Sequence, residues 1–157
     1  MRALLQRVGH RLGYRGMALL VCGIAWLNWG LGLLMDPRYG TVRGASALTA
    51  VAPMPVWAWA WIGTGVLSCS AAVLPSSRDW WGWAAATAMP VVWAAAYTSA
   101  RALGEFPQGL TSGLTWLASP ALALIVAAST RRLVHLRREV ATLRRTVVPP
   151  AARGDGP

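Results

Sequence analysis

Residues 17–35 read MALLVCGIAWLNWGLGLLM, a run without a single charged side chain. A helix needs about 20 apolar residues to cross the ~30 Å hydrocarbon core of a bilayer. The run follows Arg15 and stops at Asp36-Pro37, so polar residues bound it on both sides. It is longer than the roughly 7–15 apolar residues of a signal-peptide core. We therefore expect a retained transmembrane helix here.

Three further apolar runs follow outward from this one, at 56–74, 80–100 and 114–130. None of them contains Asp, Glu, Lys, Arg or His. Barrel strands would alternate apolar and polar positions, whereas these runs are apolar on every face. In lipid, a helix then satisfies its own backbone. The sequence predicts an all-α fold, a four-transmembrane-helix bundle over 17–130, with kinks or local breaks at Pro90 and Pro120.

The charge distribution supports this class and orients it. Of the 157 residues, 55% are hydrophobic and 13% charged, against about 25% charged in soluble domains. All 15 basic residues are Arg, and eleven of them lie in the segments 1–16 and 131–157. Because short basic segments stay inside, we expect both termini in the cytoplasm of a bacterial cell, with the chain in its inner membrane. Arginines that flank an apolar block argue against nucleic acid as the partner.

After the fourth run the pattern changes to a basic amphipathic helix over 131–148, and 149–157 should be disordered. The apolar positions form a heptad seam, which consists of Leu133, Leu136, Val140, Leu143 and Val147. The arginines expected to contact the inner leaflet or a partner are Arg131, Arg132, Arg137, Arg138, Arg144 and Arg145. Anionic lipid attracts such charges by about 1 kcal/mol each near the surface. Three roles stay open: anchoring on the leaflet (the first choice), a short coiled coil between subunits, and docking of a cytosolic or phage protein.

Small and polar residues within the runs are candidates for helix packing, and they are Asn28, Gly65, Cys69, Ser119 and Ala123. Two groups of tryptophans lie at run ends, Trp57, Trp59 and Trp61 in one and Trp80, Trp81 and Trp83 in the other, and Trp116 lies near the start of the fourth run. Tryptophan is enriched where the membrane meets water. We expect these groups to form interfacial belts.

Residues that carry chemistry are missing from the predicted spans. Proton- or ion-coupled transporters use ionisable residues at membrane depth, and these runs have none. Neither an H-E-x-x-H nor a G-x-S-x-G motif occurs, and His10 and His135 lie in opposite tails. The sequence therefore predicts no catalytic residue, no cofactor and no metal site.

A resemblance to a group of known proteins rests on four apolar strings. They are WLNWGLG at 26–32, MPVWAW at 54–59, WGWA at 81–84 and MPVVWAAAY at 89–97. With them the chain resembles a loose group of small four-span membrane proteins encoded by actinobacterial phages and prophages. The resemblance covers most of residues 15–130. It implies a multi-pass membrane protein and no particular site residue.

Three functions are compatible with these observations. The first is a structural or accessory anchor that meets the inner leaflet, or a cytosolic or phage protein, through its basic tail. The second is a holin-like protein that oligomerises and permeabilises the membrane, although a water-filled lesion needs a polar helix face. The third is a small transporter or channel subunit. The anchor is our first expectation.

Overall fold

The computed structural model describes residues 2–75 and 78–147, and every regular element in these ranges is a helix. Side chains are described there except at 2–11, 39, 131, 134, 135, 137, 138 and 144–147. The all-α prediction is thus confirmed. The segment 149–157, expected to be disordered, and residue 148 of the expected tail helix lie outside the described residues.

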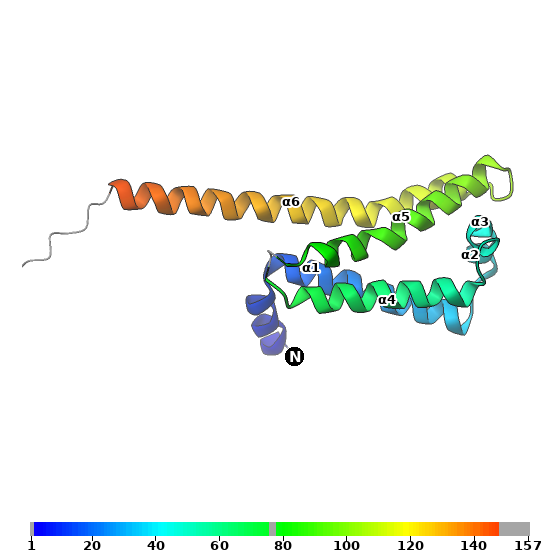
Figure 1. Cartoon of the computed structure of the whole chain (residues 1–157), viewed down its shortest axis with the longest axis horizontal. Coiled ribbons are helices and arrows are strands. Elements are labelled where there is room, and N and C mark those ends of the chain that lie inside the picture. The colour runs from blue at the N-terminus through cyan, green and yellow to red at the C-terminus, as the bar shows by residue number, and fades with distance from the viewer. Residues whose placement is uncertain (1, 76–77, 148–157) are drawn as a thin grey trace, which may run out of the picture.

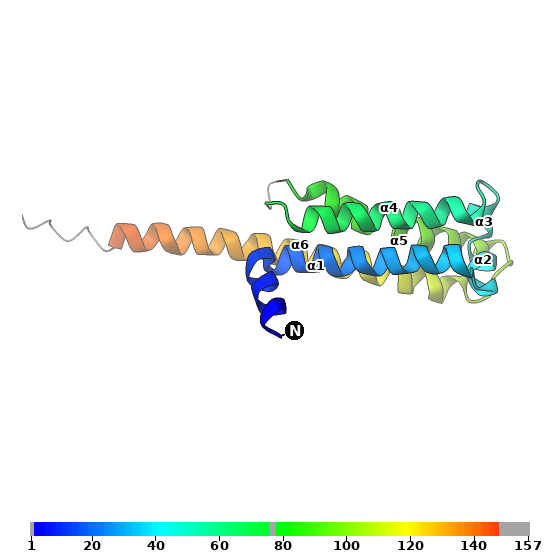
Figure 2. The ribbon, with the colours of Figure 1, turned by 90° about the horizontal axis from the view of Figure 1, so that it is seen from below.

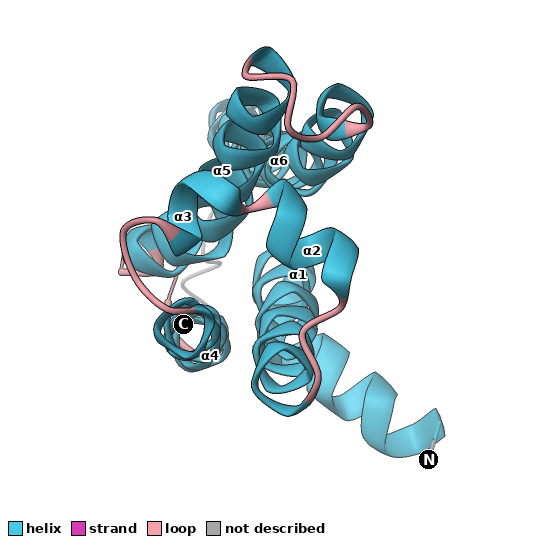
Figure 3. Ribbon diagram, turned by 90° about the vertical axis from the view of Figure 1, so that its right-hand side faces the viewer, coloured by secondary structure: helices cyan, strands magenta, loops and turns pink. Residues whose placement is uncertain are grey.

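Four long helices carry the four apolar runs, and two short ones join the first pair (Figures 1 and 2). The long helices are α1 (Arg2–Met35), α4 (Met54–Ala72), α5 (Trp80–Ala102) and α6 (Gly109–Val147). The short helices α2 (Tyr39–Gly44) and α3 (Ser46–Thr49) lie at the end of the bundle away from the N-terminus. Figure 3 looks along the bundle, with α1 beside α4 and α5 beside α6.

Among the described residues, two segments are long and apolar enough to cross a membrane by length and composition, Leu12–Met35 and Gly109–Thr130. Helices α4 and α5, which hold seven of the ten tryptophans, do not meet the same criterion. The indole N–H makes Trp amphipathic rather than purely apolar.

Helix α1 and helix α4 pack through glycines spaced seven residues apart in α1, namely Gly16, Gly23 and Gly30. A Cβ on Gly23 would lie 2.8 Å from the carbonyl oxygen of Gly65, and one on Gly30 would lie 2.8 Å from that of Ala58. Such distances leave no room for a side chain, so the backbones are in direct contact. Small residues allow this close approach between membrane helices.

The prolines within α5 and α6 do not break either helix, so the predicted local breaks are absent. Pro90 has no N–H, which leaves the carbonyl of Ala86 without its usual donor four residues on. The indole Nε1 of Trp26, from α1, donates to that oxygen at 3.0 Å. Pro120 likewise frees the carbonyl of Trp116, and the Ser119 hydroxyl donates to it at 3.2 Å.

Tryptophans fill the centre of the bundle, where the sequence pattern predicted belts at its edges. Trp61 is fully buried, with ring centroids 4.9 Å from Trp26 and 5.5 Å from Trp93. Trp83 is also buried. The belt prediction is therefore wrong for Trp61 and Trp83, because Trp61 packs against tryptophans of the facing helices and Trp83 packs in a cluster rich in alanine. It is also wrong for Trp116, whose ring packs against Trp29 and Trp61 inside the bundle. Trp59 and Trp80 do lie on the outer surface.

The N-terminal segment of α1 turns away from the bundle at Gly13 (Figure 2). This residue has φ of 61°, a conformation that glycine adopts without steric cost. The expected cytoplasmic segment 1–16 is thus mostly helical, and the helix that packs in the bundle begins directly after the bend.

The proline-freed carbonyl gives a first prediction. Trp26→Phe keeps an aromatic ring but removes the donor to Ala86, so it should lower the free energy of unfolding by about 2 kcal/mol. In a Pro90→Ala background the residue at 90 has an N–H for that carbonyl, and the same change should cost about 1 kcal/mol less. SDS titration of the micelle-bound protein, followed by far-UV circular dichroism, measures both costs. Equal costs in the two backgrounds would contradict the assignment.

The close approach of α1 and α4 gives a second prediction. Gly23→Ala should destabilise the bundle by about 1–3 kcal/mol, since the new methyl group would overlap the α4 backbone. Gly32→Ala is the matched control in the same helix, because nothing lies within 4 Å of a Cβ there. That control should be neutral, or up to about 1 kcal/mol more stable through its helix propensity. The same unfolding titration applies, and similar results for both variants would contradict the packing argument.

Candidate functional site

The tail that the sequence singled out is not a separate helix but the continuation of α6. The helix runs unbroken from Gly109 to Val147, about 58 Å at 1.5 Å per residue. Figure 1 shows its last part projecting beyond the other helices. The seventeen residues 131–147 correspond to about 25 Å of helix.

The described seam residues face outward along this projection. Leu133, Leu136, Val140 and Leu143 are 50%, 49%, 59% and 62% exposed. Val147 lies on the same seam in the last helical position, and its side chain is not described. Arg132 is exposed, and the backbone positions of Arg131, Arg137, Arg138, Arg144 and Arg145 also belong to the projecting helix. The projection therefore combines an uncovered apolar seam with arginine-bearing positions.

A buried ion pair fixes the base of this projection. The Arg15 guanidinium of α1 donates from Nε and one terminal nitrogen to the two carboxylate oxygens of Asp79, at 2.9 and 2.8 Å. The two side chains are only 11% and 4% exposed. Such a bidentate arrangement is among the stronger polar contacts available to proteins.

The same pair reaches two further helices. The second terminal nitrogen of Arg15 donates to the carbonyl of Ala127 in α6 at 3.3 Å. The Trp83 indole of α5 donates to Asp79 at 3.2 Å, and its ring lies 5.3 Å from the guanidinium carbon. One charged junction thus joins α1, α5 and α6 just before α6 leaves the bundle. The junction therefore links α6 to α1 and α5 about one turn before residues 131–147 begin.

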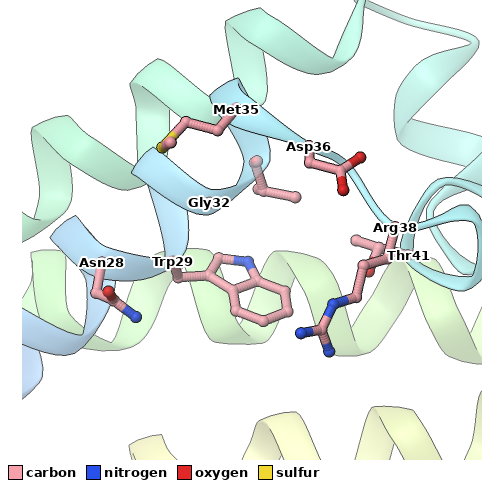
Figure 4. A pocket seen from close by; sticks show the side chains of 8 residues that line it. Asn28, Trp29, Gly32, Met35, Asp36, Arg38 and Thr41 are labelled. Carbon is pink, nitrogen blue, oxygen red and sulfur yellow. The ribbon is translucent and has the colours of Figure 1, made fainter.

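At the opposite end of the bundle, a hollow of about 350 Å³ opens beside the end of α1. Figure 4 shows Asn28, Trp29, Arg38 and Thr41 among its lining residues. The Nε1 of Trp29 is buried without a hydrogen-bond partner among the described residues. The lining carries one guanidinium and one carboxylate, that of Asp36. Its charges cancel, so it does not single out a class of ligand.

The structure distributes the five predicted packing residues over different surroundings. Gly65 lies in the α1–α4 contact, with the Cys69 sulfur next to Gly23 on the same side. Ala123 is buried against Leu19, Trp83 and Ala86. Ser119 bonds within its own helix. Asn28 is exposed at the hollow and makes no hydrogen bond to the residues that the structure describes. Cys22 and Cys69 are free thiols.

Sequence reasoning missed the Arg15–Asp79 pair. The two residues are 64 positions apart, and each was interpreted as part of a solvated segment. The sequence does contain a feature that indicates a paired carboxylate. Asp79 is the single acidic residue between Asp36 and Glu105, and it directly precedes an apolar run. An isolated carboxylate at the start of an apolar helix needs a cation, and Arg15 lies just before another apolar run.

No protein-family model, curated protein or solved structure matches this chain. The function must therefore be argued from the geometry of the bundle and its projecting helix.

The ion pair gives a third prediction. Asp79→Leu or Arg15→Met leaves one buried charge unpaired, and each should lower the free energy of unfolding by about 3 kcal/mol. The double variant leaves no charge unpaired, so it should be more stable than the sum of the two losses implies. Arg78→Met, at an exposed neighbour, should change stability by less than about 0.5 kcal/mol. Additive losses in the double variant would show that the pair is not coupled.

Proposed function

We propose that this chain is a non-enzymatic multi-pass anchor of the bacterial inner membrane, with four spans (α1 after Gly13, α4, α5 and α6 up to Thr130) and both termini in the cytoplasm. Its projecting helix presents arginines to an acidic partner, a cytosolic protein of the host or of a phage. The single observation that carries the proposal is the unbroken α6, which joins an apolar segment of spanning length to a basic helix that extends past the bundle.

The outer surface of the bundle supports the membrane assignment. Large apolar side chains are exposed around it on several helices, and they include Val21, Ile24, Leu31, Val56, Val66, Leu67, Val91, Leu117, Leu122, Leu124 and Ile125. Soluble monomers rarely expose contiguous apolar patches larger than a few hundred Å². Lipid tails are the solvent that such a surface fits.

The crossings of α4 and α5 are supported by their partners. Helix α4 contacts α1 from Ala72 beside Gly16 to Ala58 beside Gly30, so the two helices share one depth along most of their length. Helix α5 contacts α6 from Ala94 beside Gly113 to Trp83 and Ala86 beside Ala123. If α1 and α6 cross the bilayer, their partners must cross as well.

The orientation follows from the arginines. The end of the bundle that holds Arg15 and Arg78 is also the end from which residues 131–147 project. Short arginine-rich segments remain in the cytoplasm, so this end is assigned to the inside. The opposite end carries Arg38, Arg43 and Arg101 beside Asp36 and Glu105, a smaller excess of positive charge.

Distance favours a protein partner over the leaflet for the outer arginines. Arg131 and Arg132 directly follow the span and lie at headgroup level. Arg144 and Arg145 lie about 20 Å further along a straight helix, whereas attraction to surface charge is screened within about 8–10 Å at physiological salt. Lipid alone therefore does not account for arginines at the far end.

The interior favours an anchor over a permeabiliser or a transporter. The hydroxyls of Thr64, Ser68, Thr87 and Thr98 donate to backbone carbonyls of their own helices. Tryptophans in tilted and edge-to-face contact occupy the space between the helices. A holin-like lesion or a transport path needs a polar face that meets water, and the described residues offer little to build one.

The fourth prediction separates the anchor from the holin-like alternative. The full-length chain, induced in a bacterial host, should remain in the membrane fraction after carbonate extraction and leave the membrane potential unchanged, as measured by dye fluorescence. A chain truncated after Thr130 should also remain in the membrane, because the spans are intact. An abrupt, delayed collapse of the potential with the full-length chain would contradict the anchor and favour permeabilisation.

A further inference from the structure

The seam of the projecting helix continues a stripe that begins within the span. Successive residues of a helix are rotated by about 100°, so Leu114, Leu122 and Ile125 share a face with Leu133, Leu136, Val140 and Leu143. All seven are exposed. The residues of α6 that contact the bundle, Gly109, Gly113, Pro120 and Ala123, lie on the opposite face. The exposed set is named here the outer stripe.

The surroundings of the outer stripe change at Thr130. Before this residue, lipid covers the apolar side chains at no cost. After it, the helix continues out of the bilayer and the same stripe meets water. To lie on the leaflet instead, the helix would have to bend sharply near Thr130, and α6 is unbroken there. The stripe beyond Thr130 therefore needs a protein surface to cover it.

We propose that a second copy of this chain covers it, so that two α6 helices pair in parallel along the outer stripe and form a short two-stranded coiled coil beyond the membrane. This inference rests on the membrane crossing argued above. It goes beyond that function by assigning the apolar seam to self-association and the arginines outside the seam to the acidic partner.

The residue types on the seam favour a coiled coil of two parallel helices. With Leu133, Val140 and Val147 at heptad position a, Leu136 and Leu143 occupy position d. A β-branched residue at a with Leu at d favours the parallel dimer over higher oligomers. Two of the three a positions are Val and both d positions are Leu, so the pattern specifies the partner as another helix of the same kind.

The membrane raises the effective concentration and fixes the orientation of the two helices, and this compensates for the short length of the seam. Two heptads alone are marginal, but copies of one membrane protein share one orientation and one depth. Their seams therefore meet in parallel and in register, at a raised effective concentration. A two-fold axis along the membrane normal brings the same face of each copy together, as in most homodimers.

The charged residues beside the seam support the proposed dimer at one pair of positions and oppose it at another. Glu139 at position g lies opposite Arg144 at position e of the other copy, an attractive pairing. Arg132 and Arg137 occupy the corresponding positions one heptad earlier and repel, close to the headgroups, where anionic lipid offsets positive charge. Arg131, Arg138 and Arg145 fall at position f, which points away from the second copy. The dimer thus leaves these arginines outside for an acidic surface.

Cysteine cross-linking in isolated membranes tests the dimer. The variants are Leu136→Cys and Val140→Cys on the seam, with Ala141→Cys as the matched control at the same height. Ala141 is exposed and falls at position b, away from the seam. The unmodified chain, with Cys22 and Cys69, sets the baseline. After copper-phenanthroline oxidation, we expect about tenfold more band at twice the chain mass for the seam variants than for the control.

Each other outcome overturns the dimer in a distinguishable way. Equal, low cross-linking of seam and control variants, with the chain in the carbonate-resistant fraction, would reject self-association and leave the anchor standing. Cross-linking of V140C to a product of another mass would assign the seam to a different protein. A chain that fails to enter the membrane fraction would reject both the anchor and the dimer that rests on it.

Discussion

In the interior of a bilayer, where we propose that this bundle lies, no water is present to satisfy the backbone, so each polar main-chain group must find its partner within the protein. The bundle meets this constraint where its own sequence makes it hardest, at the two prolines inside α5 and α6. Trp26 supplies the donor that Pro90 removes, and Ser119 supplies the one that Pro120 removes. Because the Trp26 bond crosses from α1 to α5, satisfying the backbone also fixes how these helices pack. The tryptophans around Trp26 then fill the space that this packing encloses.

Much of the fold was readable from the sequence because hydropathy is a local property. Each uncharged run formed the body of one helix, and residues 131–147, where the pattern changes, continue the last of these helices. What hydropathy does not record is which helices meet. The seven-residue spacing of Gly16, Gly23 and Gly30 was visible in the sequence, but its meaning depends on α4 lying opposite. The belt interpretation failed at Trp61 for the same reason, since a Trp near the end of a run can face inward as readily as outward.

The residues of the candidate site could be predicted from the sequence, but the direction of the projecting helix and the contacts at its base could not. The spacing of Leu133, Leu136, Val140 and Leu143 identified the seam, and all four are exposed. The direction of the tail depended on the continuity of α6, which no single residue encodes. The Arg15–Asp79 junction escaped because charges far apart in sequence reveal no pairing until the fold brings them together. Once paired, they form the charged contact that joins the projecting helix to the rest of the bundle.

With the membrane crossing proposed above, the continuity of α6 couples the tilt of its first part to the position of its projecting end. A tilt of the span by about 10° would swing the end of the 25 Å projection sideways by roughly 4 Å, since one rigid helix carries both. Transmembrane helices adjust their tilt to the thickness of the surrounding bilayer. In the proposed arrangement, the thickness of the bilayer would therefore set the position of Arg144 and Arg145 through the tilt of one rigid helix.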